Sequence, residues 1–401
     1  MVRVISVDEH RENVTKLLGT APVRELPLVD CAGLILAEDV LAGVSLPPFD
    51  NSAMDGYAVR AADLAGAPVE LPVTGDIPAG LVDVPPLEPG TTQRIMTGAP
   101  MPPGADAVVM VEKTDGGVAR VRILEAVPVD NHVRHVGEDV REGTVALPAG
   151  TRLGPAQLGL ASAVGKDRLR VHAPLRVIVA STGTELVVPP EPLRYGQIYE
   201  SNAVMLAAAI RALGCEVEIV RSVADDVTAF RAAIEPKLRD ADLLVTSGGV
   251  SAGAYEVVKD ALADSGVEFT KVAMQPGGPQ GCGRWHGVPV VTLPGNPVSV
   301  LVSFEAFLRP ALLTALGHTG VHRLRVRAKL TEAMTSPSGR RQFRRGFYTH
   351  KEGQVTGLVG PRGGAGSHLL AAFTQSNCLI VLPEDVTAVA EGDEVDVLLI
   401  C

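Results

Sequence analysis

A regular alternation of predicted strands and helices between residues 175 and 313 constrains the fold of this chain more than any other feature. Four apolar, β-branched runs are typical of buried strands, at Leu175 to Ala180, Val217 to Val223, Leu243 to Thr246 and Val288 to Leu293. Each run precedes a segment of helical character, at Ser201 to Leu213, Thr228 to Leu238, Tyr255 to Leu262 and Val298 to Leu313. The alternation predicts a doubly wound, mostly parallel α/β sheet, whose ligand site lies beyond the carboxyl ends of its strands.

The pattern changes on both sides of this alternation. Beyond it, four runs predict the strands of a small C-terminal β-barrel, at Leu324 to Leu330, Phe343 to Thr349, Cys378 to Leu382 and Val395 to Ile400. Before it, a capping box at Ser6 to Glu9 starts a helix that ends at Gly19, and a second helix runs from Pro155 to Val164 and is ended by Gly165. Between these helices, short alternating runs broken by Pro and Gly predict an inserted β module.

These changes predict four domains, which a chain of 401 residues needs because it is too long for one ordinary core. Residues 1–47 and 132–173 form a discontinuous N-terminal linker domain, and residues 48–131 form the inserted β module. Residues 174–320 form the α/β domain, and residues 321–401 form the barrel.

Charge and composition restrict the partners. A net charge of −10 argues against a nucleic-acid partner, which requires a basic surface. Five scattered cysteines without a C-x-x-C pair predict reduced thiols and a cytoplasmic protein. The uncharged stretch from Trp285 to Phe304 is long enough to cross a bilayer, but Pro289, Pro294 and Pro297 interrupt it, so we expect no membrane insertion.

Three glycine-bearing polar loops leave predicted strands of the α/β sheet. They are Ser181-Thr182-Gly183, Ser247-Gly248-Gly249-Val250-Ser251 and Pro294-Gly295-Asn296-Pro297. Glycine allows the backbone to approach a ligand, and hydroxyl groups and free amides at a helix start suit a phosphate. Because the carboxyl ends of parallel strands share one edge of a sheet, the loops are predicted to line a single pocket. The chain lacks G-x-x-x-x-G-K-[ST], which argues against P-loop chemistry.

Acidic residues beside loops form the second group of candidates: Asp55, Asp139, Glu185, Asp225, Asp226 and Glu256. Acids that face a phosphate site indicate a divalent metal, and Mg²⁺ prefers oxygen ligands. We therefore predict Asp225, Asp226 and Glu256 as magnesium ligands. For Asp226, a helix cap explains the residue equally well. His132 and His135 have no further metal-ligand residue at suitable spacing and are interpreted as surface histidines.

The segment from Pro48 to Val59 is the densest polar loop of the chain. Together with Gly137-Glu138-Asp139-Val140 and the glycine loops at 247–251 and 294–299, it resembles the MoeA/gephyrin family, the molybdopterin molybdenumtransferases. The resemblance covers nearly the whole chain. It implies an α/β domain of the molybdopterin-binding type and a reaction in which adenylated molybdopterin is hydrolysed and molybdate is inserted at the freed dithiolene.

The resemblance also implies roles for individual residues. Asp55, Asp139 and Glu185 match family acids of the active site, and Thr97 lies in the matching Arg-Ile-Met-Thr-Gly segment. It further implies a Mg²⁺-dependent homodimer, in which the arm that carries Asp55 covers the glycine loops of the opposite subunit. A MogA-type adenylyltransferase, which supplies the adenylated substrate, is the expected partner protein.

Two departures from the family pattern concern charge. Where the family often has Lys-x-x-x-Lys-Pro-Gly-Lys-Pro, this chain keeps only Lys271, which we predict to bind the anionic substrate, and has Gln275 and Gly278 in place of the other two lysines. Arg341 and Arg345 are the predicted substitutes that bind the anionic substrate, and the alternative is an exposed basic strand. The family's Gly-Glu-x-Asp becomes Gly253-Ala254-Tyr255-Glu256, which changes the geometry of the predicted metal ligands.

These residues favour an enzyme. The first alternative is a gephyrin-like scaffold that binds a partner's peptide tail and has reduced or lost catalysis. The second is a single-domain molybdopterin-binding or adenylylating protein, against which the β module and the barrel argue.

Overall fold

In the computed structural model the described residues are 3–223, 226–250, 257–353 and 355–400. The chain divides into two compact units, which are considered separately. Unit 1 comprises residues 1–24, 33–37 and 171–401, and unit 2 comprises residues 25–32 and 38–170.

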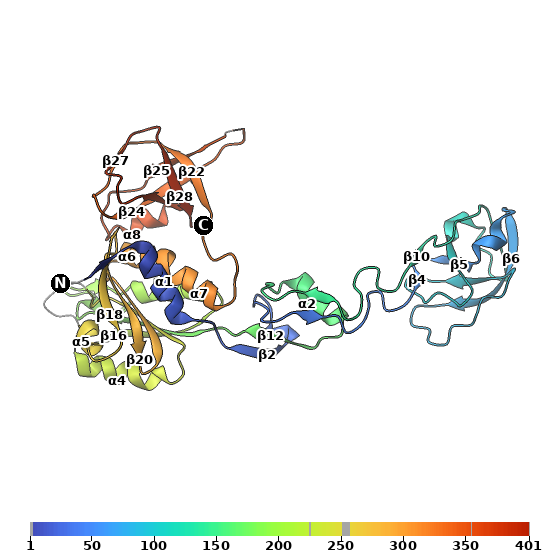
Figure 1. The fold of residues 1–401 in the computed structure, drawn as a ribbon, viewed down its shortest axis with the longest axis horizontal. Coiled ribbons are helices and arrows are strands. Elements are labelled where there is room, and N and C mark those ends of the chain that lie inside the picture. Colours follow the sequence, from blue (N-terminus) through green and yellow to red (C-terminus); the bar gives the residue numbers. More distant parts are fainter. Residues whose placement is uncertain (1–2, 224–225, 251–256, 354, 401) are drawn as a thin grey trace. The chain divides into compact units, whose positions relative to one another are not determined.

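The centre of unit 1 is a seven-stranded mixed sheet (Figure 1). Its strand order is β1 (Val4–Ile5), β18 (Glu268–Val272), β20 (Pro279–Trp285), β21 (Val288–Leu293), β17 (Leu243–Ser247), β13 (Arg176–Thr182) and β16 (Glu216–Val223). The strands from β16 to β21 run parallel, whereas β20 is antiparallel to both of its neighbours. The doubly wound sheet that the sequence predicted is therefore confirmed, with an antiparallel addition at one side.

Helices cover both faces of this sheet because consecutive strand residues point to opposite sides. Val177 and Val179 of β13 pack in one cluster with α1 (Val7–Leu18), α3 (Asn202–Arg211), α6 (Pro297–Ser303) and α7 (Arg309–Ala315). Ile178 and Ala180 pack in the opposite cluster with α4 (Val227–Leu238) and α5 (Val257–Ala261).

The helix from Pro297 to Ala315 is long and apolar enough to cross a membrane, but 78% of its 18-residue apolar stretch is buried inside the protein. A π-helical turn at Phe304–Leu308 joins α6 to α7 within it. Its apolar composition is thus explained by a place in the core.

A closed five-stranded barrel follows the sheet, as predicted (Figure 1). Its strands are β22 (Arg325–Leu330), β24 (Arg341–Thr349), β25 (Gly357–Pro361), β26 (Cys378–Leu382) and β28 (Glu394–Leu399), and the β24–β26 pairing closes it. The short strand β19 (Met274–Gln275) extends β24, and α8 (Leu370–Thr374) precedes β26. Further two-residue strands in unit 1 are β14 (Leu186–Val187), β15 (Ile198–Tyr199), β23 (Met334–Thr335) and β27 (Ala388–Val389).

Unit 2 is built around a five-stranded sheet with the order β8-β5-β7-β6-β9. The strands are β5 (Gly56–Val59), β6 (Val69–Ile77), β7 (Thr92–Ile95), β8 (Ala107–Met110) and β9 (Arg120–Ile123). Tyr57 and Val59 pack on one face of β5 and Ala58 on the other. The remaining elements are β3 (Val40–Leu41), β4 (Asn51–Ser52), β10 (Val133–Arg134), β11 (Val145–Leu147) and α2 (Pro155–Ala163), while β2 (Val23–Pro27) pairs with β12 (Arg168–His172).

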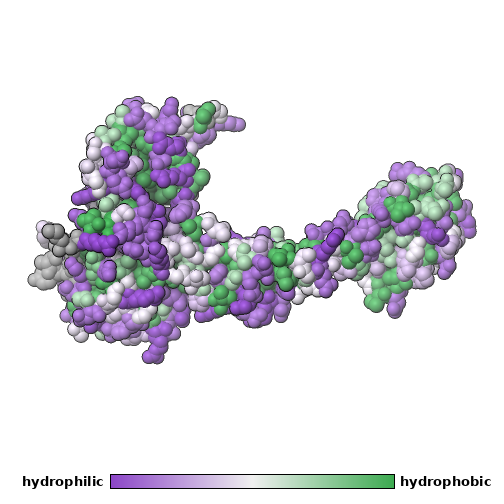
Figure 2. Space-filling model, in the orientation of Figure 1, coloured by the Kyte–Doolittle hydropathy of each residue, from purple (hydrophilic) through white to green (hydrophobic). Residues whose placement is uncertain are grey.

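The first residues of the chain belong to a different domain from the predicted one. Residues 1–47 were predicted to lie in the linker domain, but β1 pairs with β18, and α1 belongs to the core of the α/β sheet. The cap on α1 is as expected, since the Ser6 hydroxyl accepts the Glu9 N–H at 3.0 Å. On the face shown in Figure 2, hydrophilic residues dominate over the α/β sheet and the barrel, and hydrophobic residues form small scattered patches.

Candidate active site

A pocket of about 770 Å³ lies in unit 1 at the carboxyl ends of β13, β17 and β21. The strand register places Ser181 beside Ser247, and Ser247 beside Leu293, so the loops that follow these residues start side by side. All three predicted loops line the pocket, through Thr182 and Gly183, Ser247 to Val250, and Pro294 to Pro297. The prediction that they surround one pocket is confirmed for these residues; Ser251 lies outside the described residues.

Glycine is required where these loops approach one another. Gly248 has a φ of +89°, and a Cβ there would lie 3.1 Å from the carbonyl oxygen of Thr182. Gly183 has a φ of +149°, and a Cβ there would lie 2.6 Å from Oε2 of Glu185. The Glu185 carboxylate therefore lies over the Gly183 backbone, where it lines the pocket.

Polar groups inside this pocket wall lack partners among the residues that the structure describes. Ser181, Thr182, Thr246, Ser247 and Thr292 each have a buried hydroxyl without a hydrogen bond to the described chain. Of these five residues, Thr182 and Ser247 line the pocket, whereas Ser181, Thr246 and Thr292 do not. Buried polar groups are normally hydrogen-bonded, so the open hydroxyl groups of Thr182 and Ser247 are the ones that a bound molecule could satisfy.

Several pocket residues were not predicted from the sequence. Among them are Glu200 and Asn202, which lie between the end of β15 and the start of α3. The signal available was the polar segment Glu200-Ser201-Asn202 after β15, but such a segment is also typical of an ordinary helix cap.

A loop of the barrel completes the wall. Ala365, Ser367 and His368 line the pocket, and the Ser367 hydroxyl accepts a hydrogen bond from the Asn296 amide at 2.8 Å. The Val298 N–H also donates to the Ser367 carbonyl at 3.1 Å. The barrel loop is thereby attached to the Pro294 to Pro297 loop.

Arg345 holds this barrel loop and does not reach into the pocket. Its side chain is only 4% exposed and donates to three backbone carbonyls, of Arg362 at 3.4 Å, of Gly366 at 3.0 Å, and of Gly364. The prediction that Arg345 binds the substrate directly is corrected, because its donors are occupied by the backbone that they position.

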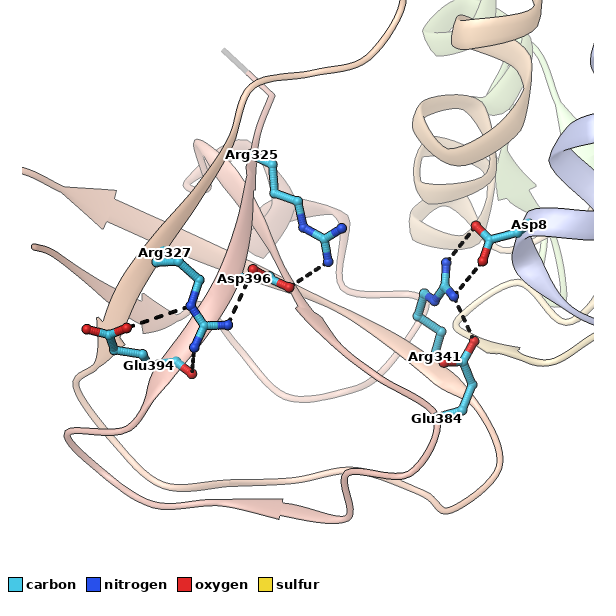
Figure 3. A network of polar contacts seen from close by, with 7 residues as sticks. All are labelled: Asp8, Arg325, Arg327, Arg341, Glu384, Glu394 and Asp396. Atoms are coloured by element: carbon cyan, nitrogen blue, oxygen red, sulfur yellow. Dashed lines mark hydrogen bonds and ion pairs between the residues drawn. The ribbon is translucent and has the colours of Figure 1, made fainter.

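Arg341 is likewise committed elsewhere (Figure 3). It donates to both carboxylate oxygens of Asp8, at 3.0 and 2.8 Å, and lies 3.1 Å from Glu384. The hydrogen bonds from Arg341 hold the pKa of Asp8 below its ordinary value. The role predicted for Arg341 in substrate binding is therefore also corrected, since the residue ties α1 to the barrel and does not line the pocket.

The second group of predicted catalytic residues lies in unit 2. Oδ1 of Asp55 accepts the Thr97 backbone N–H at 2.6 Å and the Thr97 hydroxyl at 2.9 Å. These bonds lower the pKa of Asp55, because they stabilise its charged form. The structure thus brings together Asp55 and Thr97, which are 42 residues apart in sequence.

Asp139 is exposed on a chain segment of unit 2 that is hydrogen-bonded to the segment with Leu46 and Asp50. Its N–H donates to the Leu46 carbonyl at 2.9 Å, and Val136, three residues earlier, donates its N–H to Asp50 at 2.7 Å. His135 lies 3.3 Å from Asp50, which raises the pKa of His135. The segments that carry Asp50 and Asp139 are therefore joined by hydrogen bonds.

Family models match almost the entire chain. The MoeA N-terminal region (domains I and II) matches residues 5–165, a probable molybdopterin binding domain matches residues 178–314, and the MoeA C-terminal region (domain IV) matches residues 327–400. Molybdopterin molybdenumtransferase 2 of Mycobacterium tuberculosis strain H37Rv is 51% identical over 98% of both chains. The chain belongs to the MoeA family.

Other relatives agree. Molybdopterin molybdenumtransferase of Haemophilus influenzae is 36% identical over 98% of both chains. A crystal structure of a molybdopterin biosynthesis MoeA protein from Pyrococcus horikosii superimposes with a TM-score of 0.84, at 34% identity and 99% coverage of both chains.

The described lining of the pocket in this MoeA family member lacks the lysines that the family pattern led us to expect. Lys271 is exposed on β18 and does not line the pocket, so its predicted contact with the substrate has no support in unit 1. Gln275 does line the pocket, and its Oε1 accepts a hydrogen bond from the Gln342 amide at 3.2 Å. Gly278 does not line it. The family's lysine at position 275 is thus replaced by a neutral residue in the pocket wall.

The predicted magnesium ligands do not form a cluster in the part of the chain that the structure describes. Asp226 caps α4, with its Oδ1 accepting the Ala229 N–H at 2.7 Å, which matches the alternative interpretation of this residue. Asp225 and Glu256 lie outside the described residues. Glu185 remains as a carboxylate in the pocket whose oxygens suit Mg²⁺.

Proposed function

We propose that this MoeA family member is a molybdopterin molybdenumtransferase, which hydrolyses adenylated molybdopterin and inserts molybdate into the freed dithiolene. The observation that carries the proposal is 51% identity, over 98% of the chain, to a relative of that name. The pocket of glycine loops supports it, because such loops suit phosphate groups. No observation favours the gephyrin-like alternative.

The pocket residues have distinct roles in this proposal. Thr182 and Ser247 offer hydroxyl groups to the phosphate oxygens, and Gly248 and Gly249 allow the backbone to approach them. Asp55, ionised because Thr97 donates to it, places and deprotonates the water that breaks the bond between the two phosphates. Asp139 and Glu185 are further proposed catalytic carboxylates.

A magnesium ion, when bound, would neutralise charge on the phosphate oxygens. Glu185 is the pocket carboxylate proposed to hold it, and Asp225, Asp226 and Glu256 stay as predicted ligands.

The proposal extends to a cytoplasmic homodimer that receives its substrate from a MogA-type adenylyltransferase. We assign Asp55 and the 247–251 loop of each active site to different subunits, as the resemblance to the family implies. A two-fold dimer then contains two composite sites.

Release of AMP from adenylated molybdopterin tests the reaction. We expect release that requires Mg²⁺ and stops with a chelator, together with molybdate-dependent formation of the molybdenum cofactor. A pure, folded protein that releases no AMP at saturating Mg²⁺ would refute the proposed function.

Mixed dimers test the composite sites. Inactive Asp55→Asn chains are mixed with inactive Gly248→Val chains, and random pairing should restore activity to about a quarter of wild type, because half of the dimers carry one intact site of two. Either variant alone, taken through the same mixing protocol, is the control. No recovery after demonstrated subunit exchange would show that each site is built within one chain.

A further inference from the structure

Two buried acceptor atoms at the start of α3 lie in the pocket wall without a partner. Glu200 is only 4% exposed, and its Oε1 accepts the Ala203 N–H at 2.7 Å. Its Oε2 is buried and has no hydrogen bond to any described residue. Asn202 donates from its Nδ2 to the Gly295 carbonyl at 2.7 Å, while its Oδ1 is buried and also lacks a described partner.

This arrangement is unfavourable unless a ligand completes it. A buried acceptor without a hydrogen bond loses its interaction with water, and a charged one loses most. Both residues line the pocket, so a molecule bound there can reach them. Because both open positions are acceptors, an organic ligand that fills them presents N–H or O–H donors.

An aromatic residue lines the same pocket. Tyr199 directly precedes Glu200 on the chain and is 44% exposed. A ring of this kind offers a flat apolar face to a planar ligand. The combination of a ring and two inward acceptors suits a flat heterocycle with adjacent N–H groups along one edge.

The carboxylate selects among heterocycles. A carboxylate pairs well with two adjacent donors, as in its bidentate pairs with guanidinium, and Oε1 of Glu200 can accept a second hydrogen bond in addition to that from the Ala203 N–H. The pyrimidine edge of a pterin carries such a pair, the 2-amino group and the neighbouring N3–H. Adenine presents one donor next to an acceptor nitrogen, which would face the carboxylate unfavourably.

We infer that Glu200 binds the 2-amino and N3–H edge of the pterin ring, with Asn202 accepting beside it and Tyr199 covering the ring face. The inference rests on the proposed function, which supplies the pterin, and it assigns one end of the pocket to the heterocycle. The glycine loops then face the phosphates.

Two pteridines that differ at one group test the inference. 6-Hydroxymethylpterin has the 2-amino group, and 6-hydroxymethyllumazine has an oxygen in its place. Titration calorimetry with the full-length wild-type protein should show tighter binding of the pterin by about tenfold to a hundredfold, the effect of one charge-assisted pair.

Glu200→Gln is the matched variant, because it keeps an oxygen for the Ala203 N–H and removes the charge. Its amide can pair with either pteridine, so the ratio of the two dissociation constants should fall to within about threefold. Glu185→Gln, which removes another pocket carboxylate, should leave the ratio unchanged.

Two results would overturn the inference. One is a wild-type protein that binds both pteridines equally or binds neither, a result that needs no variant to fold. The other is a folded Glu200→Gln protein with the wild-type ratio. AMP release by the wild-type protein distinguishes failure of this inference from failure of the proposed function. If AMP is released but the pteridine test fails, only the assignment of Glu200 is refuted. If no AMP is released, the proposed function itself is refuted.

Discussion

The pocket of unit 1 and the acidic loop of unit 2 hold their polar groups in opposite ways. In the pocket, the Ser247 hydroxyl and the Oε2 atom of Glu200 are buried and lack partners in the described chain. In unit 2, Asp55 and Asp50 are exposed, yet each accepts hydrogen bonds from its own backbone surroundings. The pocket therefore leaves buried polar groups open, whereas the carboxylates of the acidic loop are already held by hydrogen bonds within the chain.

The two regions also shift the pKa of histidine in opposite directions. His10, in the core of unit 1, packs edge-on against Phe307 with 4.7 Å between ring centroids, and burial lowers its pKa to about 4. His135, on the surface of unit 2, has its pKa raised by its hydrogen bond to Asp50. Burial opposes charge in the first region, and a paired carboxylate favours charge in the second.

The largest effect on AMP release is expected when Asp55, in the acidic loop of unit 2, loses its charge. Asp55→Asn should reduce AMP release at least about a hundredfold, because an amide can neither deprotonate water nor bind a cation as a carboxylate does. Asp115→Asn is the matched control, since Asp115 in the same unit also accepts backbone N–H bonds and has a lowered pKa. Near-wild-type release by a folded Asp55→Asn protein would contradict the assigned role.

Acid should destabilise unit 1 through His10. The folded pKa is depressed, so this contribution to stability is present above pH 6.5 and is lost as the pH falls through about 4. The total loss is about 3 to 4 kcal/mol, because the pKa of His10 falls from 6.5 to about 4 and a tenfold change in proton affinity corresponds to about 1.4 kcal/mol. His10→Phe should remove that loss in urea titrations at pH 7 and pH 4, with exposed His286→Gln as the control. An unchanged pH dependence in His10→Phe would disprove the account.

Arg345→Lys should loosen the pocket wall without touching its lining. The compact ammonium group of lysine cannot reach all three carbonyls that the Arg345 guanidinium binds, so the free energy of unfolding should fall by about 2 kcal/mol. We expect the KM for adenylated molybdopterin to rise about tenfold, with a smaller change in kcat. Arg341→Lys, which weakens only the pair with Asp8 and Glu384, should leave KM unchanged. Equal KM values in both variants would show that the loop does not depend on Arg345.

A cation restored to the pocket should tighten binding. Gln275→Lys adds an ammonium group to the pocket wall and should lower the dissociation constant of adenylated molybdopterin about tenfold, the effect of one charge-assisted bond. Lys271→Ala, outside the pocket lining, should change it less than about twofold. If Lys271→Ala changes the dissociation constant more than Gln275→Lys does, the anion binds near β18 and not in the pocket.

The smallest effect concerns His135 and Asp50. The pKa of His135 is raised above 6.5, so its contribution to stability is present below pH 6.5 and is lost as the pH rises through the folded value. Because the pair is exposed, the change is best followed by NMR titration of the His135 ring. Asp50→Asn should return the midpoint toward 6.5, and an unmoved midpoint would mean that Asp50 is not its cause.

The sequence predicted the parts of the fold that local patterns determine. The strands β13, β16, β17 and β21 were found because each is an apolar run beside a helical segment. The strands β18 and β20 were not predicted, because Glu268–Val272 and Pro279–Trp285 carry charged, Gly or Pro residues and depend on antiparallel partners. The two residues of β1 form a strand only because β18, more than 260 residues later, lies beside them.

The site was predicted to the same depth. The glycine loops could be placed because strand order alone puts the ends of parallel strands together. Arg341 and Arg345 could not be told apart by sequence, since both lie on β24 in the same basic run. Their roles differ through Asp8 and the carbonyls of the 362–366 loop, which no local pattern reveals. Whether the pocket residues bind the substrate stays a prediction.

The barrel and the α/β layer share one hydrophobic cluster, in which Phe343, Leu379 and Val381 of the barrel join Phe307 and Val14. Removing the barrel would expose this cluster to water, and the exposed apolar surface would promote aggregation. The slowest hydrogen exchange in both domains should therefore report the same global opening, because neither can open fully while the other stays closed. Unit 2, with its own apolar clusters, has the makings of an independent foldon. For protein engineering, the natural place to divide this chain is thus between its two units, and the linker before the barrel is a poor choice.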